Sequence, residues 1–530
     1  MYRVRMMLLN TALLTAAALV MRSVGMAFQV YLSQKIGAAG IGLYSLVMSV
    51  SALAATVALS GIRFTATRLV AMELGRGSPA GARLAVRRCL LYALACGTLA
   101  ASALWFGAGT IGAGWIGDAR TVAPLRVLAV SLPAFSLTAV LSGYFTAAGN
   151  VIKPTAAQAA ETAVRIASVV FALSARGGAE LGTICSIIVA GGVAGEMVSF
   201  FIHLCMYLRE CRRHLGVEGA DRSAGTAHAI FATAVPLALS AYARVALTTV
   251  QNLLVPRGLR KHGSSSEGAL ADYGMIQGMV FPVITFPSAI FYSLAELLVP
   301  ELTRAQVQGD ARRIAQLARH TLRYALMFSL CAAAVLFRFS GELGQALYGS
   351  AEAGALIRAL SPLVPIMYVD SVTDGMLRGL GQQMHSMRYN VLDSLLSLAL
   401  VCVLLPRYAI GGYIFIIYFT EAFNFALSIH RLAKVARVAL GAVHALKSAF
   451  CAFGDAEIAV FLLRLCGLPL AAPGGVIAAH IALSAAAYAV LLMALGALTR
   501  GDADRLRALI GAFGAQRDAR ESPVARERPL

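Results

Sequence analysis

Charged side chains are scarce in this chain of 530 residues. Asp, Glu, Lys and Arg together make up 13% of the sequence, whereas soluble globular domains carry about 25%. Hydrophobic residues account for 59%, and the mean hydropathy is +0.74. This shortage of charge excludes a water-soluble globular protein of this length.

Sequence signatures of disulfide, metal and nucleotide sites are also missing. The nine cysteines are scattered, without a Cys-x-x-Cys pair or a histidine cluster, and we expect small buried thiols. No Gly-x-Ser-x-Gly, Walker phosphate loop or His-Glu-x-x-His occurs. The sequence therefore predicts no disulfide framework, no metal site and no bound ATP.

Apolar residues are gathered in blocks of about 20, the length that crosses about 30 Å of hydrocarbon. The first block follows Arg3 and Arg5, as in a signal peptide, but it continues to Tyr31 and is predicted to span. We predict an all-α polytopic membrane protein with about fourteen transmembrane helices. They lie near residues 7–31, 40–60, 88–110, 124–148, 155–174, 183–208, 230–254, 275–298, 321–340, 355–378, 388–406, 410–429, 446–468 and 475–498.

The basic residues, which give a formal net charge of +19, sit between the apolar blocks. With a cytoplasmic N-terminus, the inside segments hold about 31 Lys and Arg and the outside segments about 11, in agreement with the positive-inside rule. Both termini of this multi-pass protein are therefore predicted to lie on the cytoplasmic side of the cytoplasmic (inner) membrane. Anionic membrane lipid explains the basic charge, and no nucleic acid partner is expected.

Two inside segments, 62–75 and 302–323, mix arginines with apolar residues. Basic amphipathic helices on the cytoplasmic leaflet fit both, and a solvated charged segment fits each equally well. Residues 499–530 are polar, and we expect one short surface helix followed by a disordered tail.

A weak duplication relates two parts of the chain at an offset of about 230 residues. Matching residues recur in pairs: Pro133/Pro365, Gly143/Gly375, Gly149/Gly381, Glu161/Asp393 and Tyr44/Tyr273. Each copy would hold six spans, so both copies enter the membrane in the same direction and form a parallel repeat. We predict a six-helix lobe in 1–222, a second in 223–440, two additional helices in 441–498 and a cytoplasmic tail in 499–530.

Two lobes around a central site are the usual frame for alternating-access transport. The sequence therefore predicts a transporter and no enzyme. An ion gradient, the membrane potential or the substrate gradient would drive transport, so the expected cofactors are none beyond a coupling Na⁺ or H⁺.

Ionisable side chains inside spans cost at least about 2.5–3.5 kcal/mol at mid-bilayer and normally face the bundle interior or water. The candidates are Arg22, Glu161, Arg165, Glu196, Arg244, Glu296, Asp370, Asp374, Asp393 and Glu421. Arg22 and Arg244 occupy the first helix of each copy. We interpret them as cations that hold an anionic group such as a pyrophosphate in a central cavity, with pairing to carboxylates as the alternative.

Gln29 and Gln251 lie seven residues beyond Arg22 and Arg244, two turns along the same helix faces. Their amides are candidates for binding sugar hydroxyls. A plain hydrogen bond between helices is the favoured interpretation.

Glu161 and Arg165 are four residues apart and share one helix face, which favours a structural ion pair. His203 and His480 stand alone in apolar surroundings and are expected to donate hydrogen bonds to neighbouring helices.

Asp370 and Asp374 share a face in the same way, with Arg378 one turn further on. They either bind a coupling Na⁺ or H⁺ or form a salt-bridge network with Arg378. Together with Glu161, Arg165 and Asp393 they make up the predicted coupling or structural ion network.

Four stretches follow one another through both predicted lobes. They are Arg22-Ser-Val-Gly25 continuing to Leu32-Ser-Gln-Lys-Ile-Gly37-Ala-Ala-Gly-Ile-Gly-Leu-Tyr44; Pro236-Leu-Ala-Leu-Ser240 continuing to Asn252-Leu-Leu-Val-Pro256; Tyr273-Gly-Met-Ile-Gln-Gly278-Met-Val-Phe-Pro282; and Phe286-Pro287 continuing to Leu298-Val-Pro300. With these stretches the chain resembles the stage V sporulation protein B-like branch of oligosaccharide flippases, within the multidrug/oligosaccharidyl-lipid/polysaccharide exporter superfamily.

The resemblance implies two six-helix lobes plus two extra helices, and a substrate built on a polyprenyl pyrophosphate. A peptidoglycan or spore-cortex precursor is the favoured cargo, and Arg22 carries over directly from the family pattern. The family has further basic residues where Gln29 and Gln34 stand, and usually an Arg just after the position of Ser240. This chain has Arg244 one turn later.

The resulting hypothesis is a flippase for a lipid-linked oligosaccharide, acting as a monomer among membrane lipids. One alternative is a cation-coupled multidrug exporter of the same superfamily, for which twelve spans and an acidic, aromatic cavity would be typical. A membrane-embedded enzyme acting on lipid-linked sugars is a further alternative. Such enzymes usually need a catalytic acid or His in a sizeable outside loop, and the longest outside segment expected here is 255–274.

Overall fold

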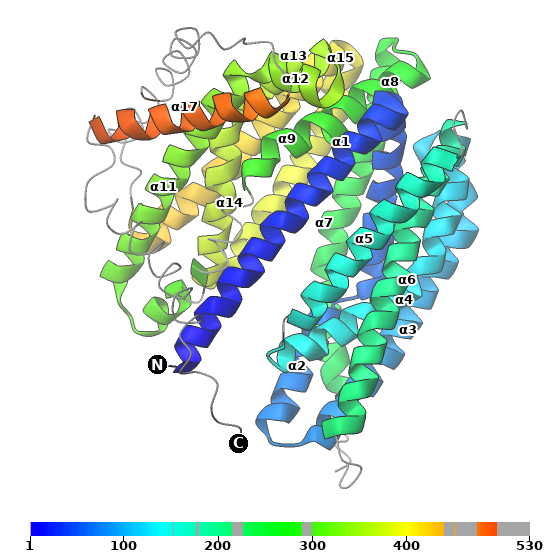
Figure 1. The fold of residues 1–530 in the computed structure, drawn as a ribbon, viewed down its shortest axis with the longest axis vertical. Coiled ribbons are helices and arrows are strands. Elements are labelled where there is room, and N and C mark those ends of the chain that lie inside the picture. Colours follow the sequence, from blue (N-terminus) through cyan, green and yellow to red (C-terminus); the bar gives the residue numbers. More distant parts are fainter. Residues whose placement is uncertain are drawn as a thin grey trace. The chain divides into compact units, whose positions relative to one another are not determined.

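The computed structural model describes residues 2–150, 152–175, 180–214, 226–288, 298–299, 301–438, 451 and 474–494. Helices dominate these ranges, which contain no strand (Figure 1). Nine helices within them are long and apolar enough to cross a membrane. The predicted all-α polytopic membrane fold is confirmed, while the total of fourteen spans stays a prediction.

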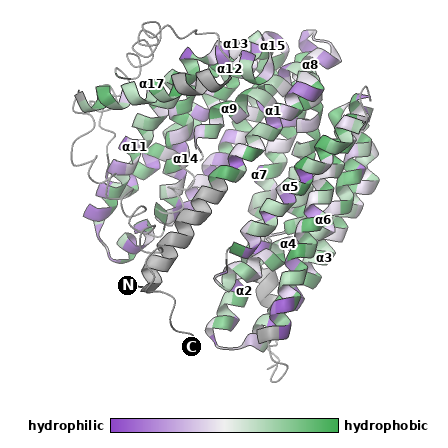
Figure 2. Cartoon of the chain, in the orientation of Figure 1, coloured by the Kyte–Doolittle hydropathy of each residue, from purple (hydrophilic) through white to green (hydrophobic). Residues whose placement is uncertain are grey.

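Most predicted spans coincide with helices of the described part. Figure 2 shows apolar residues along most of their length. Apart from Cys451, the predicted span 446–468 lies outside the described residues, as does the tail 499–530. In chain order the helices are α1 (Tyr2–Leu59), α2 (Ile62–Gly75), α3 (Pro79–Gly109), η1 (Thr110–Ile116), η2 (Ala119–Thr121), α4 (Val122–Ala147), α5 (Ile152–Ala175), α6 (Leu181–His214), α7 (Thr226–His262), α8 (Ser266–Gly274), η3 (Met275–Val280), α9 (Phe281–Thr285), η4 (Phe286–Ser288), α11 (Ala311–Arg338), α12 (Ser340–Tyr348), α13 (Ala351–Leu360), η5 (Ser361–Leu363), α14 (Val364–Gly379), α15 (Gln383–Ala436) and α17 (Gly474–Ala494).

Two of these helices each contain two predicted spans. α1 is interrupted at Gly37, whose φ of 68° and ψ of 177° are not helical, and this residue separates the predicted spans 7–31 and 40–60. α15 is interrupted at Ala409, with φ 47° and ψ −132°, between the predicted spans 388–406 and 410–429. Positive φ is uncommon for a residue other than glycine, so Ala409 marks a sharp local bend.

The chain divides into two compact units. The first contains Met1–Ser23, Val283–Ser386 and Glu421–Leu530, and the second contains Val24–Pro282 and Met387–Thr420. α7, α8 and η3 therefore belong to the same unit as the helices of the first predicted lobe. The lobe boundary at residue 222 stays a prediction.

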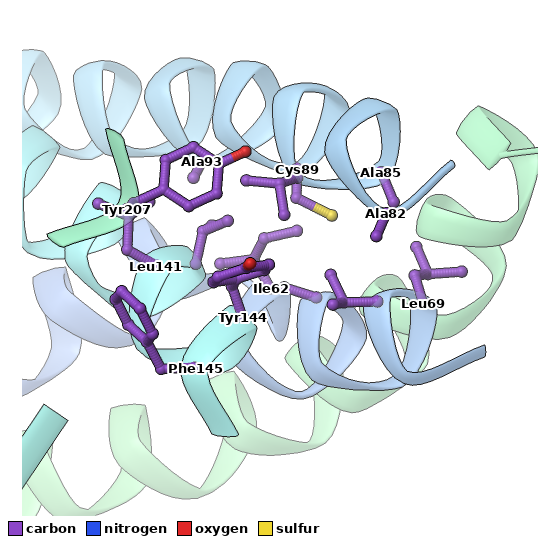
Figure 3. Close-up of a cluster of buried hydrophobic side chains, with 14 of the residues drawn as sticks. Ile62, Leu69, Ala82, Ala85, Cys89, Ala93, Leu141, Tyr144, Phe145 and Tyr207 are labelled. Atoms are coloured by element: carbon purple, nitrogen blue, oxygen red, sulfur yellow. The ribbon is translucent and has the colours of Figure 1, made fainter. Parts of the chain in front are cut away.

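An apolar core in the second unit joins α2, α3, α4 and α6 (Figure 3). Ile62 and Leu69 of α2 pack there with Cys89 of α3, and Tyr144 of α4 meets Tyr207 of α6 at 5.0 Å between ring centroids. Residues 62–75 form a helix, as predicted. The prediction that the apolar face of this helix lies on the lipid of the cytoplasmic leaflet is wrong. That face is buried against α3 and α4, where it covers more apolar surface than a shallow contact with lipid headgroups would.

The second expected surface helix, 302–323, is not continuous. Residues 301–307 form one helix, which ends at Gly309, where φ is 70°. The side chain of Asp310 then accepts a hydrogen bond from the main-chain N–H of Arg313 and caps the start of α11. The segment 255–274, which is predicted to be an outside loop, is largely helical. α7 runs to His262, and α8 begins at Ser266.

The duplication in the sequence has a counterpart in the backbone. α4 and α14 are each followed by a glycine of positive φ, Gly149 at 73° and Gly381 at 66°, 232 residues apart. The same two hydrogen bonds close both helices: Gly149 N–H to Thr146 O and Asn150 N–H to Phe145 O, and Gly381 N–H to Arg378 O and Gln382 N–H to Leu377 O. This is the Schellman arrangement, in which glycine accepts the left-handed conformation without steric cost.

Two more glycine pairs of positive φ keep the same spacing, Gly77/Gly309 and Gly117/Gly349. Ser78 follows Gly77 and caps α3, just as Asp310 follows Gly309 and caps α11. The offset of 232 therefore holds through several helix ends. Repeated end geometry supports a duplicated helical unit more strongly than isolated residue matches do.

Glycines also allow α1 to approach α8 and η3 closely. A Cβ on Gly274 would lie 2.1 Å from the main-chain oxygen of Ala38 and 2.4 Å from the nitrogen of Gly42. A Cβ on Gly42 would lie 2.0 Å from the main-chain oxygen of Leu270. The two backbones touch here, as in membrane helix pairs that use small residues at their contact.

Replacing Gly274 by Ala should force α1 and α8 apart and destabilise the protein by about 1–3 kcal/mol, the usual cost of overpacking. Thermal unfolding of the purified protein in detergent measures this. The matched variant is Gly25→Ala, because a Cβ on Gly25 meets nothing within 4 Å. Equal melting temperatures for the two variants would contradict the close contact.

Candidate functional site

The described part of the predicted eighth span, residues 275–288, is not a regular α-helix. α8 is followed by the π-helix η3, the short α9 and the 3₁₀-helix η4. Changes of helix type alter which carbonyls receive main-chain hydrogen bonds, and they are frequent at functional sites. Carbonyls in this segment are therefore available to side chains of neighbouring helices.

Two of the predicted site residues on α1 bind such carbonyls. In the first unit, a guanidinium nitrogen of Arg22 donates to the main-chain oxygen of Thr285 at 2.9 Å. In the second unit, the amide of Gln29 donates to the main-chain oxygen of Gly278 at 3.0 Å. For Gln29 this is the hydrogen bond between helices that its sequence context favours.

Arg244 lies at the centre of α7, 18 residues from each end of the helix. Its side chain is exposed and forms no ion pair within the described residues. A guanidinium at mid-membrane depth faces protein or water and not lipid, because burial in hydrocarbon is costly. Arg244 falls inside the predicted span 230–254, so its exposed side chain is expected to face protein or water. Gln251, two turns further along α7, is half-buried.

Glu161 and Arg165 of α5 form an ion pair, with 2.7 Å between Oε1 and a guanidinium nitrogen. α6 reaches this pair closely, since a Cβ on Gly195 would lie 2.7 Å from the main-chain oxygen of Glu161 and 3.3 Å from the Cβ of Arg165. Glu196, the next residue on α6, is half-buried, and its Oε2 has no hydrogen-bond partner among the described residues. The second unit thus contains a compact polar cluster between α5 and α6.

A second polar cluster lies in the first unit between α14 and the end of α15. Asp370 is 7% exposed, and its Oδ2 accepts a hydrogen bond from the amide of Asn424 at 3.0 Å. Two buried oxygen atoms of this cluster, Oδ1 of Asp370 and Oδ1 of Asn424, have no hydrogen-bond partner among the described residues, and the hydroxyl of Ser428 lies beside Asp370 and Asp374. Buried unpaired oxygens require an explanation, such as a bound ion or water.

No ion pair joins Arg378 to Asp370 or Asp374 among the described residues, although the charge of Arg378 acts on Asp374. Asp374 accepts a hydrogen bond from Ser386 at 2.7 Å, and Arg378 is exposed without an ion pair. Asp393, on α15, is half-buried and belongs to the second unit.

Sequence reasoning missed Asn424 and Ser428. Glu421-x-x-Asn424-Phe425 on α15 matches Glu196-x-x-Ser199-Phe200 on α6, and Ser428 is one turn beyond Asn424. This match between α6 and α15 could have identified Asn424 and Ser428 in the sequence. Without it they are inconspicuous, because neutral polar residues are common in membrane spans.

A multi-pass α-helical fold with polar clusters inside its spans is that of a membrane transporter. The family model described as polysaccharide biosynthesis protein matches residues 7–306, and the chain belongs to this family. The resemblance seen in the sequence is confirmed.

Known relatives agree with this assignment. Stage V sporulation protein B of Bacillus subtilis (strain 168) is 24% identical over 415 residues, which cover 76% of this chain and 78% of the relative. A multidrug resistance MATE family transporter in an inward-facing conformation is similar at a TM-score of 0.59 and 14% identity, over 78% of this chain and 95% of that chain. The lipid II flippase MurJ in an inward closed conformation is similar at a TM-score of 0.58 and 13% identity, over 90% and 98%. At these identities the structures show a shared fold.

Replacing Gln29 by Ala should leave the carbonyl of Gly278 without its side-chain donor and lower stability by about 1–3 kcal/mol, the cost of an unsatisfied buried polar group. Thermal unfolding measures the loss. Gln158→Ala, which removes an exposed amide on α5, is the control. A loss of the same size in both variants would exclude a special role for the Gln29 hydrogen bond.

Proposed function

We propose that this protein is a flippase that carries a polyprenyl-pyrophosphate-linked oligosaccharide across the cytoplasmic membrane by alternating access. The observation that carries the proposal is the exposed Arg244 at the centre of α7, without an acidic partner among the described residues. A cation in a water-filled space inside a membrane protein attracts an anion. Guanidinium binds phosphate oxygens through strong charge-assisted hydrogen bonds.

The substrate chemistry follows from this charge and from the apolar surroundings. The pyrophosphate and the sugars would cross through the hydrated space beside Arg244, with Gln251 available to sugar hydroxyls. The polyprenyl chain would stay in the bilayer. Similarity to stage V sporulation protein B and to the lipid II flippase MurJ supports a peptidoglycan or spore-cortex precursor as the cargo.

A multidrug exporter is the less favoured alternative, although its fold is shared. Arg244, which forms no ion pair among the described residues, would repel cationic drugs, while it attracts phosphate. We also propose that both termini lie in the cytoplasm, because this orientation puts the excess of Lys and Arg on the cytoplasmic side.

Replacing Arg244 by Ala should abolish complementation of a flippase-depleted host, since the headgroup loses its cation. Arg244→Lys should keep part of the activity, because the charge remains while the bidentate geometry is lost. Arg312→Ala, which removes an exposed arginine at the start of α11, is the control. Headgroup accessibility in proteoliposomes measures translocation directly, and full activity of Arg244→Ala would refute the assigned role.

We also propose that the cluster around Asp370 binds the coupling cation, Na⁺ or H⁺. The unpaired oxygens of Asp370 and Asn424 and the neighbouring hydroxyl of Ser428 support this, because hard cations prefer oxygen ligands. Asp370 forms no ion pair within the described residues, so no basic side chain neutralises it there.

Replacing Asp370 by Asn should remove the dependence of translocation on the Na⁺ or proton gradient. It should also lower the translocation rate at least about tenfold, which corresponds to an increase of about 1.4 kcal/mol in the activation free energy. Translocation with and without an imposed gradient in proteoliposomes measures the effect. Glu301→Gln, at an exposed carboxylate, is the matched control. A gradient response that survives in Asp370→Asn would contradict the site.

A further inference from the structure

Two serines tie α7 to the second half of α1 within the second unit. The side-chain amide of Asn252 donates a hydrogen bond to the hydroxyl of Ser49 at 3.0 Å, and the hydroxyl of Thr249 donates to the main-chain oxygen of Ser49 at 3.1 Å. Ten residues before Asn252, the hydroxyl of Tyr242 is hydrogen-bonded to that of Ser60, directly after the end of α1. These contacts form the α1–α7 ladder.

Both serine hydroxyls place their own protons on α1. The hydroxyl of Ser49 donates to the main-chain oxygen of Ser45 at 3.0 Å, and that of Ser60 donates to the main-chain oxygen of Val57. The two serine oxygens are therefore acceptors for α7, and Tyr242 is the donor of its pair. Hydrogen bonds of this kind between membrane helices fix how the helices face each other.

The ladder determines which face of α7 is buried in the unit. Successive residues of an α-helix are separated by about 100°, so Tyr242, Thr249 and Asn252 share one face. Thr249 is only 4% exposed. Ala234 continues this face, and a Cβ on Gly61 would lie 2.7 Å from its main-chain oxygen. This face of α7 is therefore packed closely along its length.

Arg244 lies on the opposite face of α7. It is about 200° around the helix from Tyr242, and Gln251 is about 180° around it. Arg244 and Thr248 are exposed, and Gln251 is half-buried. The hydroxyl of Thr248 donates to the main-chain oxygen of Arg244 at 3.1 Å, so its oxygen can also accept a hydrogen bond. A rotation of α7 that breaks the ladder would also turn Arg244 away from its place.

We propose that the α1–α7 ladder positions the headgroup-binding face of α7. Its members on α7 are positioning residues, because they fix the rotation of the helix from the side opposite to the substrate. The exposed face then presents a cation at Arg244, a hydroxyl at Thr248 and an amide at Gln251 along about 10 Å. This order suits a phosphate next to a hydroxylated sugar. The inference rests on the proposed function, which makes Arg244 the cation that binds the headgroup.

Phenylglyoxal, which modifies exposed guanidinium groups, tests the orientation of α7 in purified full-length protein in detergent. Peptide mass spectrometry measures the labelling rate of Arg244 relative to that of Arg312, an exposed arginine at the start of α11. In Tyr242→Phe and in Asn252→Ala the relative rate should fall roughly threefold, because losing one hydrogen bond shifts an equilibrium by about that factor. The double variant should show a larger fall. Arg244 is already exposed, so a rotation of α7 can only bury it.

Thr56→Val is the matched control, because the hydroxyl of Thr56 donates to the main-chain oxygen of Ala52 on its own helix. It should leave the labelling of Arg244 unchanged. The melting temperature of each variant is measured on the same samples. A lower melting temperature with an unchanged or increased labelling rate at Arg244 would show a purely structural contact and overturn the proposal. If the double variant does not fold, the two single variants decide the outcome.

Inorganic pyrophosphate separates this inference from the proposed function. It should slow the labelling of Arg244 in wild type, and this protection should weaken in the ladder variants. Without protection in wild type, the proposed function would fail, while a ladder effect on labelling would still show that α7 is positioned as described. Protection in wild type combined with unaltered labelling in the ladder variants would overturn this inference and keep the proposed function.

Discussion

Hydrocarbon neither hydrates nor screens charge, so a charged side chain inside a membrane span needs a partner within the protein. This requirement accounts for the contacts of several charged residues in the predicted spans. Glu161 pairs with Arg165, Arg22 binds a main-chain oxygen, and Asp370 takes a neutral amide. Arg244 is the exception, since its charge is exposed at the centre of a long helix. In the proposed transport cycle, such a group would lie where water, and an anion carried in water, enters the membrane.

The same constraint governs the backbone. Main-chain groups that leave a regular α-helix inside a membrane need other partners. At the irregular eighth span, Gln29 supplies one such partner to Gly278. At the ends of α4 and α14, paired glycines allow the carbonyls to be bonded by the residues that follow. Irregular segments are therefore tolerated at a few positions, each with its own donor.

Much of the fold could be predicted from the sequence because membrane helices are specified locally by length and hydropathy. The break at Gly37 and the bend at Ala409 fall between predicted spans, and the repeat markers Gly149 and Gly381 prove to be equivalent helix caps. The burial of α2 could not be predicted. An amphipathic pattern shows that one face is apolar, but it does not show whether lipid or protein covers that face.

The candidate site was less accessible to prediction. Charged residues in spans are rare and stand out, so Arg22, Glu161, Arg165 and Arg244 could be selected by composition alone. Their partners could not, because a main-chain oxygen such as that of Thr285 has no sequence signature. Asn424 and Ser428 were overlooked for a related reason: neutral polar side chains acquire significance only through the carboxylate that they face.

The division of the chain into compact units has a consequence for its history. Residues up to Ser23 belong to the unit that contains α14, and α7 belongs to the unit that contains α3 to α6. A gene cut between the two copies would encode two fragments, neither of which holds a whole unit. Each fragment would therefore need residues of the other to complete a compact unit.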